Sequence, residues 1–200
     1  NAQGEYYLTD VIEMAVADGA HVTTLTVEDP MEVQGVNNRL QLAQLERHYQ
    51  ELRARELLLG GVTLADPARF DLRGELHCGK DVEIDINVII EGKVTLGNRV
   101  TIGPNVYIKN ATIGDDTHIL ANSHLDHVEI ADKCAVGPYA RLRPGTVLNT
   151  GSKIGNFVET KKAKIGAGSK VNHLSYIGDA TLGKNVNVGA GTITANYDGK

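Results

Sequence analysis

Residues 82–108 read VEIDINVIIEGKVTLGNRVTIGPNVYI and place an aliphatic side chain at every sixth position. The repeated residues are Ile84, Ile90, Leu96, Ile102 and Ile108, and a second aliphatic stands two positions ahead of each, at Val82, Val88, Val94, Val100 and Val106. A period of six fits neither a helix, with about 3.6 residues per turn, nor a lone strand, with a period of about 2. It is typical of a β-solenoid in which each flat side is one hexapeptide and three sides make a triangular coil.

The pattern continues toward the C-terminus with two slips of phase. It resumes at Ile113, Ile119 and Leu125, then at Ile130, Val136, Leu142, Leu148 and Ile154, and after Thr160 at Ile165, Val171 and Ile177. A glycine often follows the aliphatic residue, as at Gly97, Gly103, Gly114, Gly137, Gly155, Gly166, Gly178, Gly183 and Gly189. We expect these glycines at corners whose backbone dihedrals require Gly. A β-sandwich is disfavoured because it would need turn signals every ~8–12 residues.

The first 80 residues follow a different pattern. A helix is expected over residues 9–18, stopped by Gly19, followed by a strand over residues 21–27, as in a piece of an α/β domain. A long helix is expected from a cap near Asn37 to a stop at Gly60–Gly61. Its apolar stripe comprises Leu42, Leu45, Tyr49, Leu52 and Leu59, and Pro67 and Gly74 are expected to act as breakers before the first coil.

Composition limits the function classes. The chain has 200 residues, 42% of them hydrophobic but only 4% aromatic, which suits a narrow and regular interior. The net charge of -5 gives no signal for nucleic-acid binding. No run approaches the ~18 apolar residues of a membrane helix, and no signal peptide is visible. Cys78 and Cys134 match no metal-binding spacing; free thiols are expected, with a disulfide as the less favoured alternative.

Several segments outside the repeats carry a resemblance: GVNNRLQL (35–42), DPARFDLRG (66–74), RLRPG (141–145), GNFVETKK (155–162), VNHLSYIGD (171–179) and NVNVGAGTITANYDGK (185–200). Together they resemble the family of bacterial bifunctional N-acetylglucosamine-1-phosphate uridyltransferases and glucosamine-1-phosphate N-acetyltransferases, over essentially the whole chain. The resemblance implies a mainly β fold: a left-handed parallel β-helix preceded by a helical arm and the tail of a Rossmann-like domain. The implied divisions are residues 1–37 for that tail, 38–61 for the linker helix and 62–200 for the acetyltransferase domain.

The activity that the resemblance implies is acetyl transfer from acetyl-CoA to glucosamine-1-phosphate, followed by Mg²⁺- and UTP-dependent formation of UDP-N-acetylglucosamine for peptidoglycan and lipopolysaccharide precursors. A cytoplasmic homotrimer without an integral membrane segment is expected. The chain starts without Met, and no segment resembles the family's Gly-rich nucleotide-binding loop. We therefore expect a fragment that does not transfer uridylyl groups by itself and whose coenzyme A site is incomplete at the C-terminal end.

His173 is the candidate catalytic residue. An amine attacks a thioester only after losing its ammonium proton, and a neutral imidazole is a suitable base near pH 7. The segment around it matches the family segment whose His has this role. The alternative is an inert surface histidine on a repetitive wall.

The acceptor sugar carries a phosphate, which cations bind well. By resemblance, Arg143 and Lys161 contact the phosphate, and Tyr176 and Asn187 contact the sugar or phosphate; surface charges and a solenoid asparagine are the alternatives. The resemblance also assigns the acetyl-CoA side to three residues, Ala190, Asn196 and Tyr197. Glu159 is a candidate for orienting the base or the amine.

Two further assignments concern metals. Asn37 matches the family's Mg²⁺ ligand, and its amide oxygen suits a hard cation; the alternative, compatible with the first, is a helix N-cap. The segment HLDHVE (124–129) contains His, Asp and Glu side chains but falls across a slip of phase, so a corner is favoured over a metal site.

Two other functions remain open at this point. One is a different hexapeptide-repeat acyltransferase that uses the same histidine chemistry on another acceptor. The other is a non-catalytic structural solenoid, or a zinc hydratase of this shape. The hydratase would need several histidine ligands, whereas His173 is the only His in the last 70 residues.

Overall fold

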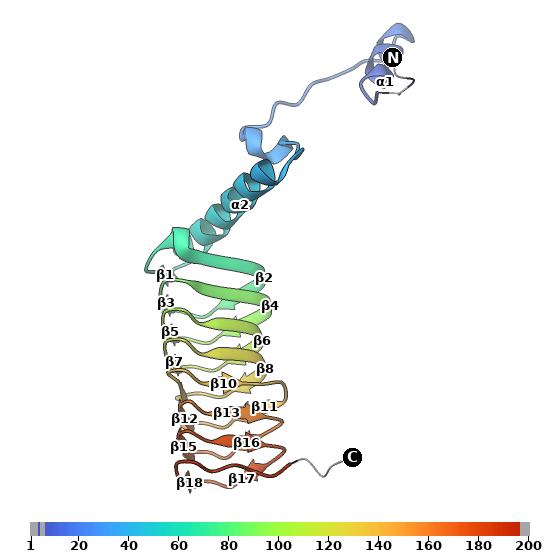
Figure 1. The fold of residues 1–200 in the computed structure, drawn as a ribbon. Coiled ribbons are helices and arrows are strands. Elements are labelled where there is room, and N and C mark those ends of the chain that lie inside the picture. The colour runs from blue at the N-terminus through green and yellow to red at the C-terminus, as the bar shows by residue number, and fades with distance from the viewer. Residues whose placement is uncertain (1–3, 5–6, 197–200) are drawn as a thin grey trace. The chain divides into compact units, whose positions relative to one another are not determined.

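A computed structural model describes residue 4 and residues 7–196, which fall into two compact units, Asn1–Leu45 and Glu46–Lys200. The second unit is a parallel β-helix of about seven coils, as the six-residue period predicts, and it is consistent with the left-handed sense implied by the resemblance. Figure 1 shows its strands stacked coil upon coil. No helix among the described residues is long and apolar enough to cross a membrane.

Each coil contributes strands to three flat faces. Face 1 comprises β1 (Thr63–Leu64), β3 (Glu83–Ile84), β5 (Thr101–Ile102), β7 (His118–Ile119), β9 (Ala135–Val136), β12 (Lys153–Asn156), β15 (Lys170–His173) and β18 (Asn187–Val188). Faces 2 and 3 share four long strands that bend around a corner: β2 (Phe70–Cys78), β4 (Val88–Leu96), β6 (Tyr107–Ile113) and β8 (His124–Ile130).

Beyond β8 the two faces have separate strands. Face 2 continues with β10 (Arg141–Leu142), β13 (Glu159–Lys161) and β16 (Tyr176–Gly178), and face 3 with β11 (Thr146–Leu148), β14 (Lys164–Ile165) and β17 (Thr181–Leu182). The division is visible in the pairing of β8, whose Leu125 lies opposite Leu142 of β10 and whose Ile130 lies opposite Leu148 of β11. Every pairing is parallel, so each coil repeats the path of the one before it.

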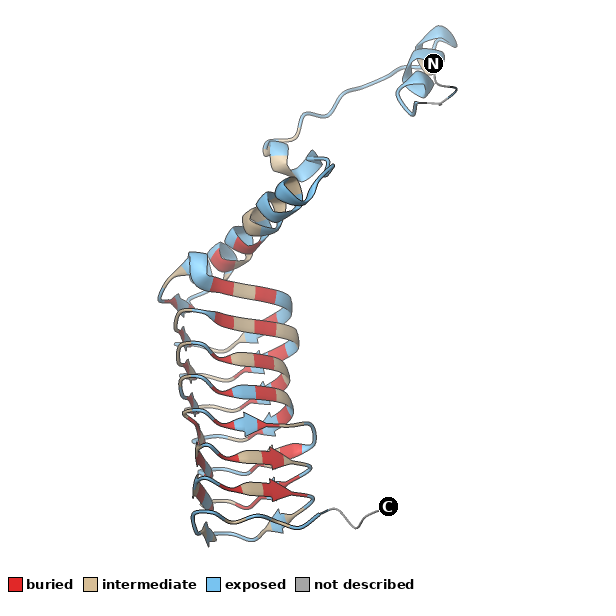
Figure 2. Cartoon of the chain, in the orientation of Figure 1, coloured by how far each residue is buried: buried red, intermediate tan, exposed pale blue. Residues whose placement is uncertain are grey.

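The repeated aliphatic residues form the core. Both series named above, from Val82 to Ile108, are at most 2% exposed, and the burial continues through Ile177. Figure 2 shows buried residues recurring along the strands of successive coils. The first slip of phase is a register shift in which Glu91 of β4 lies opposite Lys109 of β6, but Val94 lies opposite Ala111. One coil thus loses a corner residue while its inward columns stay aligned.

The expectation that the repeated glycines provide unusual dihedrals is wrong for nearly all of them. Only Gly137 of that set has a positive φ, at 97°. The left-handed corners are held mostly by other residues: Asp81, Asn87, Arg99, Asn105, Asn110, Asp116, Asn122, His127, Lys133, Tyr139, Phe157, Lys162, Leu174, Asp179 and Asn185. The glycines are required instead by the close approach of the next coil, because a Cβ on Gly155 would overlap the carbonyl of Asn172 and one on Gly166 that of Gly183.

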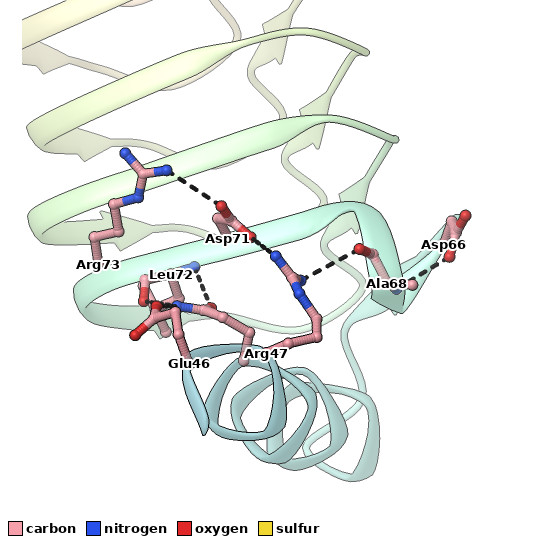
Figure 3. Close-up of polar contacts among 8 residues, drawn as sticks. Glu46, Arg47, Asp66, Ala68, Asp71, Leu72 and Arg73 are labelled. Carbon is pink, nitrogen blue, oxygen red and sulfur yellow. Dashed lines mark hydrogen bonds and ion pairs between the residues drawn. The ribbon is translucent and has the colours of Figure 1, made fainter. Parts of the chain in front are cut away.

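Helix α2 (Arg39–Leu59) ends as predicted, at Gly60 and at Gly61, whose φ is 92°. Its apolar stripe is not its buried side: Leu42, Tyr49, Leu52 and Leu59 are exposed, whereas Gln50 and Ala54 are buried. The reason lies in the hydrogen bonds of the first coil, where the Gln50 amide accepts from the Leu72 N–H at 2.7 Å and donates to the Leu72 carbonyl at 3.0 Å. Figure 3 shows Leu72 beside the ion pair between Arg47 and Asp71, whose charged atoms are 2.8 Å apart.

The described residues also include two 3₁₀ turns and one more helix. Helix α1 (Asp10–Ala17) forms where predicted and ends before Gly19, whose φ is 79°. The turns are η1 (Pro30–Val33) and η2 (Pro67–Arg69). The strand expected over residues 21–27 does not form. A strand needs a hydrogen-bonded neighbour, and the described residues of the first unit contain no other strand. Gly74 does not break a strand either; it lies within β2 at φ 150°, stacked on Gly92.

Replacing Gly166 by Ala should lower the free energy of unfolding by about 1–3 kcal/mol, because the added methyl group overlaps the backbone of the next coil. Urea unfolding followed by circular dichroism measures the change. Gly189→Ala is the matched control, since a Cβ there meets no atom within 4 Å and the φ is not positive. Equal midpoints for the two variants would contradict the explanation from coil spacing.

Candidate functional site

Face 2 brings three of the four predicted acceptor residues together on successive coils. Arg141 lies opposite Glu159, and Glu159 lies opposite Tyr176. Arg143 follows β10 directly, and its backbone N–H donates to the Thr160 carbonyl at 2.9 Å, which places it level with Lys161. Because Leu142 and Thr160 are buried, the residues on either side of them point outward from the face.

The charges on face 2 alternate until they reach this group. In the upper coils Lys109 pairs with Glu91 at 2.6 Å. Lower down, Glu159 accepts a hydrogen bond from Arg143 at 2.9 Å and lies 3.9 Å from Arg141. Within residues 7–196, Lys161 makes no ion pair, and Arg141 and Arg143 share the Glu159 carboxylate, so the group carries an excess of positive charge. Such an excess of positive charge attracts an anion, and guanidinium groups suit phosphate oxygens in particular.

A buried hydroxyl pair lies beneath this group, where the sequence pattern shows a Thr in place of an aliphatic residue. The Thr146 and Thr160 hydroxyls are 3.0 Å apart inside the coil, and Thr146 also donates to the Arg143 carbonyl at 2.8 Å. Both residues are fully buried. The contact fixes the backbone that carries Arg143, and it restricts where the guanidinium can reach.

His173 lies at the corner where β15 of face 1 turns toward β16 of face 2. It is exposed, and its Nδ1 is 2.7 Å from Oδ1 of Asn156, its register partner in the preceding coil. Among the described residues no hydrogen bond to Nε2 is formed, which leaves that nitrogen available to a ligand. Glu159, the sequence-based candidate for orienting the base, is instead bound to Arg143.

Tyr176 and Asn196 contact each other, although the sequence assigns them to the acceptor and the coenzyme respectively. Asn196 donates to the Tyr176 hydroxyl at 3.1 Å and also bonds Asp179. Gly178 makes room for this arrangement, because a Cβ there would lie 2.5 Å from the Tyr176 oxygen. The sequence pattern gave no sign of Asp179 or of the role of Gly178.

The remaining predicted residues belong to the eighth, partial coil. Asn187 lies in β18 on face 1, exposed, and its Oδ1 is 3.4 Å from the Asn172 amide. Ala190 is exposed and follows His173 by 17 residues, which is the offset that β18 keeps from β15. Tyr197 lies outside the described residues.

A hollow of about 380 Å³ adjoins His173 on the face 1 side. It is lined by Leu120, Gly137, Pro138, Lys153, Gly155, Asn156, Asn172 and His173. The imidazole therefore stands between this hollow and the cationic group of face 2. A side chain in that position can act on a ligand that approaches from either side.

The other titratable side chains near the coil surface are poorer candidates for chemistry. Burial lowers the pKa of His124, and the neighbouring Arg141 cation lowers it further. Burial raises the pKa of Cys78 to about 11 and also raises the pKa of Cys134. A thiol held protonated is a weak nucleophile, and both cysteines are free. Neither thiol is suited to carry an acyl group.

Asn37 provides little for a metal. The helix cap is Asn38, whose Oδ1 accepts from the Gln41 N–H at 2.9 Å, so the alternative role suggested for Asn37 is wrong. The Asn37 side chain is exposed, and a single neutral amide does not make a Mg²⁺ site. The described part of the chain contains no group of three or more His, Cys, Asp or Glu residues that could hold a metal ion, so no chemical step is assigned to one.

The sequence is similar both to a protein-family model and to a curated protein. The family model described as the GMPPB C-terminal domain matches residues 72–158. A curated protein of Marinobacter nauticus, "Bifunctional protein GlmU", is 62% identical over 199 residues, which is 100% of this chain and 44% of that protein. The chain thus spans less than half the length of this curated relative.

Among solved structures, a mutant of AntD, an N-acyltransferase from Bacillus cereus in complex with dTDP and coenzyme A, is 15% identical, with a TM-score of 0.47 over 53% of this chain and 76% of that one. A mutant of GDP-perosamine N-acetyltransferase from Caulobacter crescentus is 20% identical, with a TM-score of 0.37 over 93% and 88%. Similarities this remote give no information about the activity of this chain.

Proposed function

Because this chain belongs to the family of the bifunctional protein GlmU, we propose that its β-helix transfers the acetyl group of acetyl-CoA to the amine of glucosamine-1-phosphate. In this reaction the ammonium group first loses a proton. The amine nitrogen then forms a bond to the thioester carbon, the carbon–sulfur bond breaks, and coenzyme A leaves as its thiol. The product is the N-acetylated sugar phosphate.

One arrangement carries the proposal: Arg143, Lys161 and Tyr176 lie on three successive coils of face 2, and His173 lies at the corner that leads to Tyr176. The cations bind the sugar phosphate and Tyr176 orients the sugar. Nε2 of His173 takes the ammonium proton as general base. Asn187, Ala190 and Asn196 contact the sugar and the coenzyme from the following coil, and Tyr197 is assigned to the coenzyme on the resemblance alone.

The rest of the family's activity is proposed on the resemblance. Residues 1–37 form the tail of a uridyltransferase domain, residues 38–61 the linker helix and residues 62–200 the acetyltransferase domain. UTP-dependent uridylylation follows acetylation in the full-length protein, and Asn37 contributes one ligand to the Mg²⁺ of that site. The two free thiols fit a reducing cytoplasm, where the product supplies cell-wall precursors.

We also propose a homotrimer, supported by an apolar ridge beside His173. Tyr139, Phe157 and Leu174 occupy the same corner of three successive coils and are 53%, 56% and 63% exposed. The first two rings stack with centroids 5.3 Å apart. All three have a positive φ, which is uncommon for bulky residues and turns their side chains outward. A second copy of the chain would bury this ridge.

Replacing His173 by Ala should lower the turnover number by about 10²–10⁴-fold, the usual contribution of a general base. The measurement is thiol release from acetyl-CoA with glucosamine-1-phosphate, using the full-length protein. His118→Ala is the matched control, because His118 is also exposed and its Nδ1 also contacts a side chain of the preceding coil, Thr101, at 2.6 Å. Rates that agree within a few-fold for both variants would assign the general base to another residue, whereas an inactive parent would favour a non-catalytic solenoid.

Replacing Lys161 by Ala should weaken binding of glucosamine-1-phosphate by about 10- to 100-fold, since a hydrogen bond to a charged group contributes about 1.5–3 kcal/mol. The KM for glucosamine-1-phosphate and its dependence on ionic strength report the change. Lys164→Ala removes a lysine from face 3 and should leave the KM unaltered. If the two lysine variants bind the sugar phosphate equally well, Lys161 does not contact the phosphate.

Replacing Phe157 by Asp should dissociate the trimer, because a carboxylate would be buried without a partner in the contact between copies. Light scattering coupled to size-exclusion chromatography measures the mass of the parent and the variant. Asp at Leu120, which is 40% exposed but lies off the ridge, serves as the control. A parent that is monomeric at all concentrations would contradict the proposal directly.

A further inference from the structure

The contact between His173 and Asn156 joins two coils at the corner of the candidate site. The residues are register partners in β15 and β12, and the distance from Nδ1 to Oδ1 is 2.7 Å. The backbone is bonded at the same place, since the Leu174 N–H donates to the Asn156 carbonyl at 3.1 Å. Leu174 and Phe157, which follow the two residues, have φ values of 46° and 55°. The hydrogen-bonded backbone therefore holds the side chains of both His173 and Asn156 in place.

An imidazole with a hydrogen-bond acceptor at Nδ1 keeps its proton there, and its Nε2 keeps a lone pair. From this geometry we propose that Asn156 is a positioning residue: its amide oxygen accepts from Nδ1–H of His173 and so presents Nε2 as the proton acceptor. The inference rests on the acetyl transfer proposed above. It adds a residue that acts through His173 and does not touch the substrate.

The chemistry of the partner suits this role. A carboxylate at this position would favour the charged imidazolium, which cannot accept a proton. An amide oxygen accepts the same hydrogen bond without adding a charge. The nearest carboxylate predicted from sequence, Glu159, is occupied by Arg143. The amide therefore orients the ring without placing a negative charge beside it.

Titratable groups lie on the strands around this corner, with the exception of β18. Lys153 of β12 lines the same hollow as the pair, and Lys170 lies on the strand of His173 itself. Glu159 and Lys161 of β13 and Tyr176 of β16 lie on face 2. Strand β18, on the far side, contains only Asn187 and Val188. None of these groups bonds the imidazole in the described structure, so Asn156 is its one side-chain partner there.

The test compares Asn156→Ala and Asn156→Asp with the parent in the full-length protein. Alanine should lower kcat by about 10- to 100-fold, the effect seen when a metal-ligating histidine loses its orienting partner, with KM values kept within a few-fold. Nitrogen-15 NMR of His173 should show the Nδ1–H tautomer in the parent and its loss in the alanine variant. Aspartate should move the acid limb of the kcat/KM profile to higher pH, because the added carboxylate favours the protonated ring.

Asn98→Ala is the matched control, since the Asn98 amide also bridges coils, to the Lys80 N–H and to Asp115, but far along the chain from His173. It should change neither the tautomer nor the pH profile. The inference is overturned if the parent is active and Asn156→Ala keeps both the tautomer and kcat. It is also overturned if Asn156→Asp and Asn98→Ala move the pH profile equally. A parent with no acetyltransferase activity would overturn the proposed function, and the role of Asn156 in it, whatever the NMR result.

Discussion

The distance between hydrogen-bonded parallel strands, about 4.8 Å, controls the whole solenoid. Each coil must repeat the path of the previous coil to keep its ladder, so every position stacks on its counterpart one coil away. Inward positions then form aliphatic columns such as Ile84, Ile102 and Ile119. Positions that face the next backbone too closely have no room for a Cβ, as at Gly155. The sequence repeats because equivalent positions of successive coils stack on one another at this spacing.

The candidate site arises where outward residues depart from that regularity. Along face 2, opposite charges pair between coils, as Glu91 and Lys109 do. The alternation ends where Lys161 follows Arg143, and the interior changes at the same level, with Thr146 and Thr160 in place of aliphatic residues. At the neighbouring corner the stacked asparagines of the upper coils give way to bulky apolar residues beside His173. The candidate site thus lies in coils whose framework is otherwise unchanged.

The period of six was sufficient to predict the coils and the buried columns, because burial fixes the aliphatic positions directly. The period could not explain why a glycine recurs. A recurring glycine can indicate either a positive φ or a close approach of the neighbouring coil, and the sequence does not distinguish the two. The prediction of a strand over residues 21–27 was wrong because a strand forms only beside a hydrogen-bonded neighbouring strand, which the local sequence does not reveal. The contact of Asn156 with His173 also escaped prediction: it depends on a coil length that varies with each lost corner residue.

The Gln50 side chain gives the first coil a property that the stacked coils lack. Its amide offers one acceptor and one donor to Leu72, which is the pattern an added strand would offer. An open strand edge invites pairing with another molecule, and proteins commonly protect such edges. With Gln50 and Arg47 placed along β2, a foreign strand would have to displace a helix to pair there. The cap therefore opposes end-to-end fibre growth at this end of the ladder, with Ala54 of the same helix buried in the core.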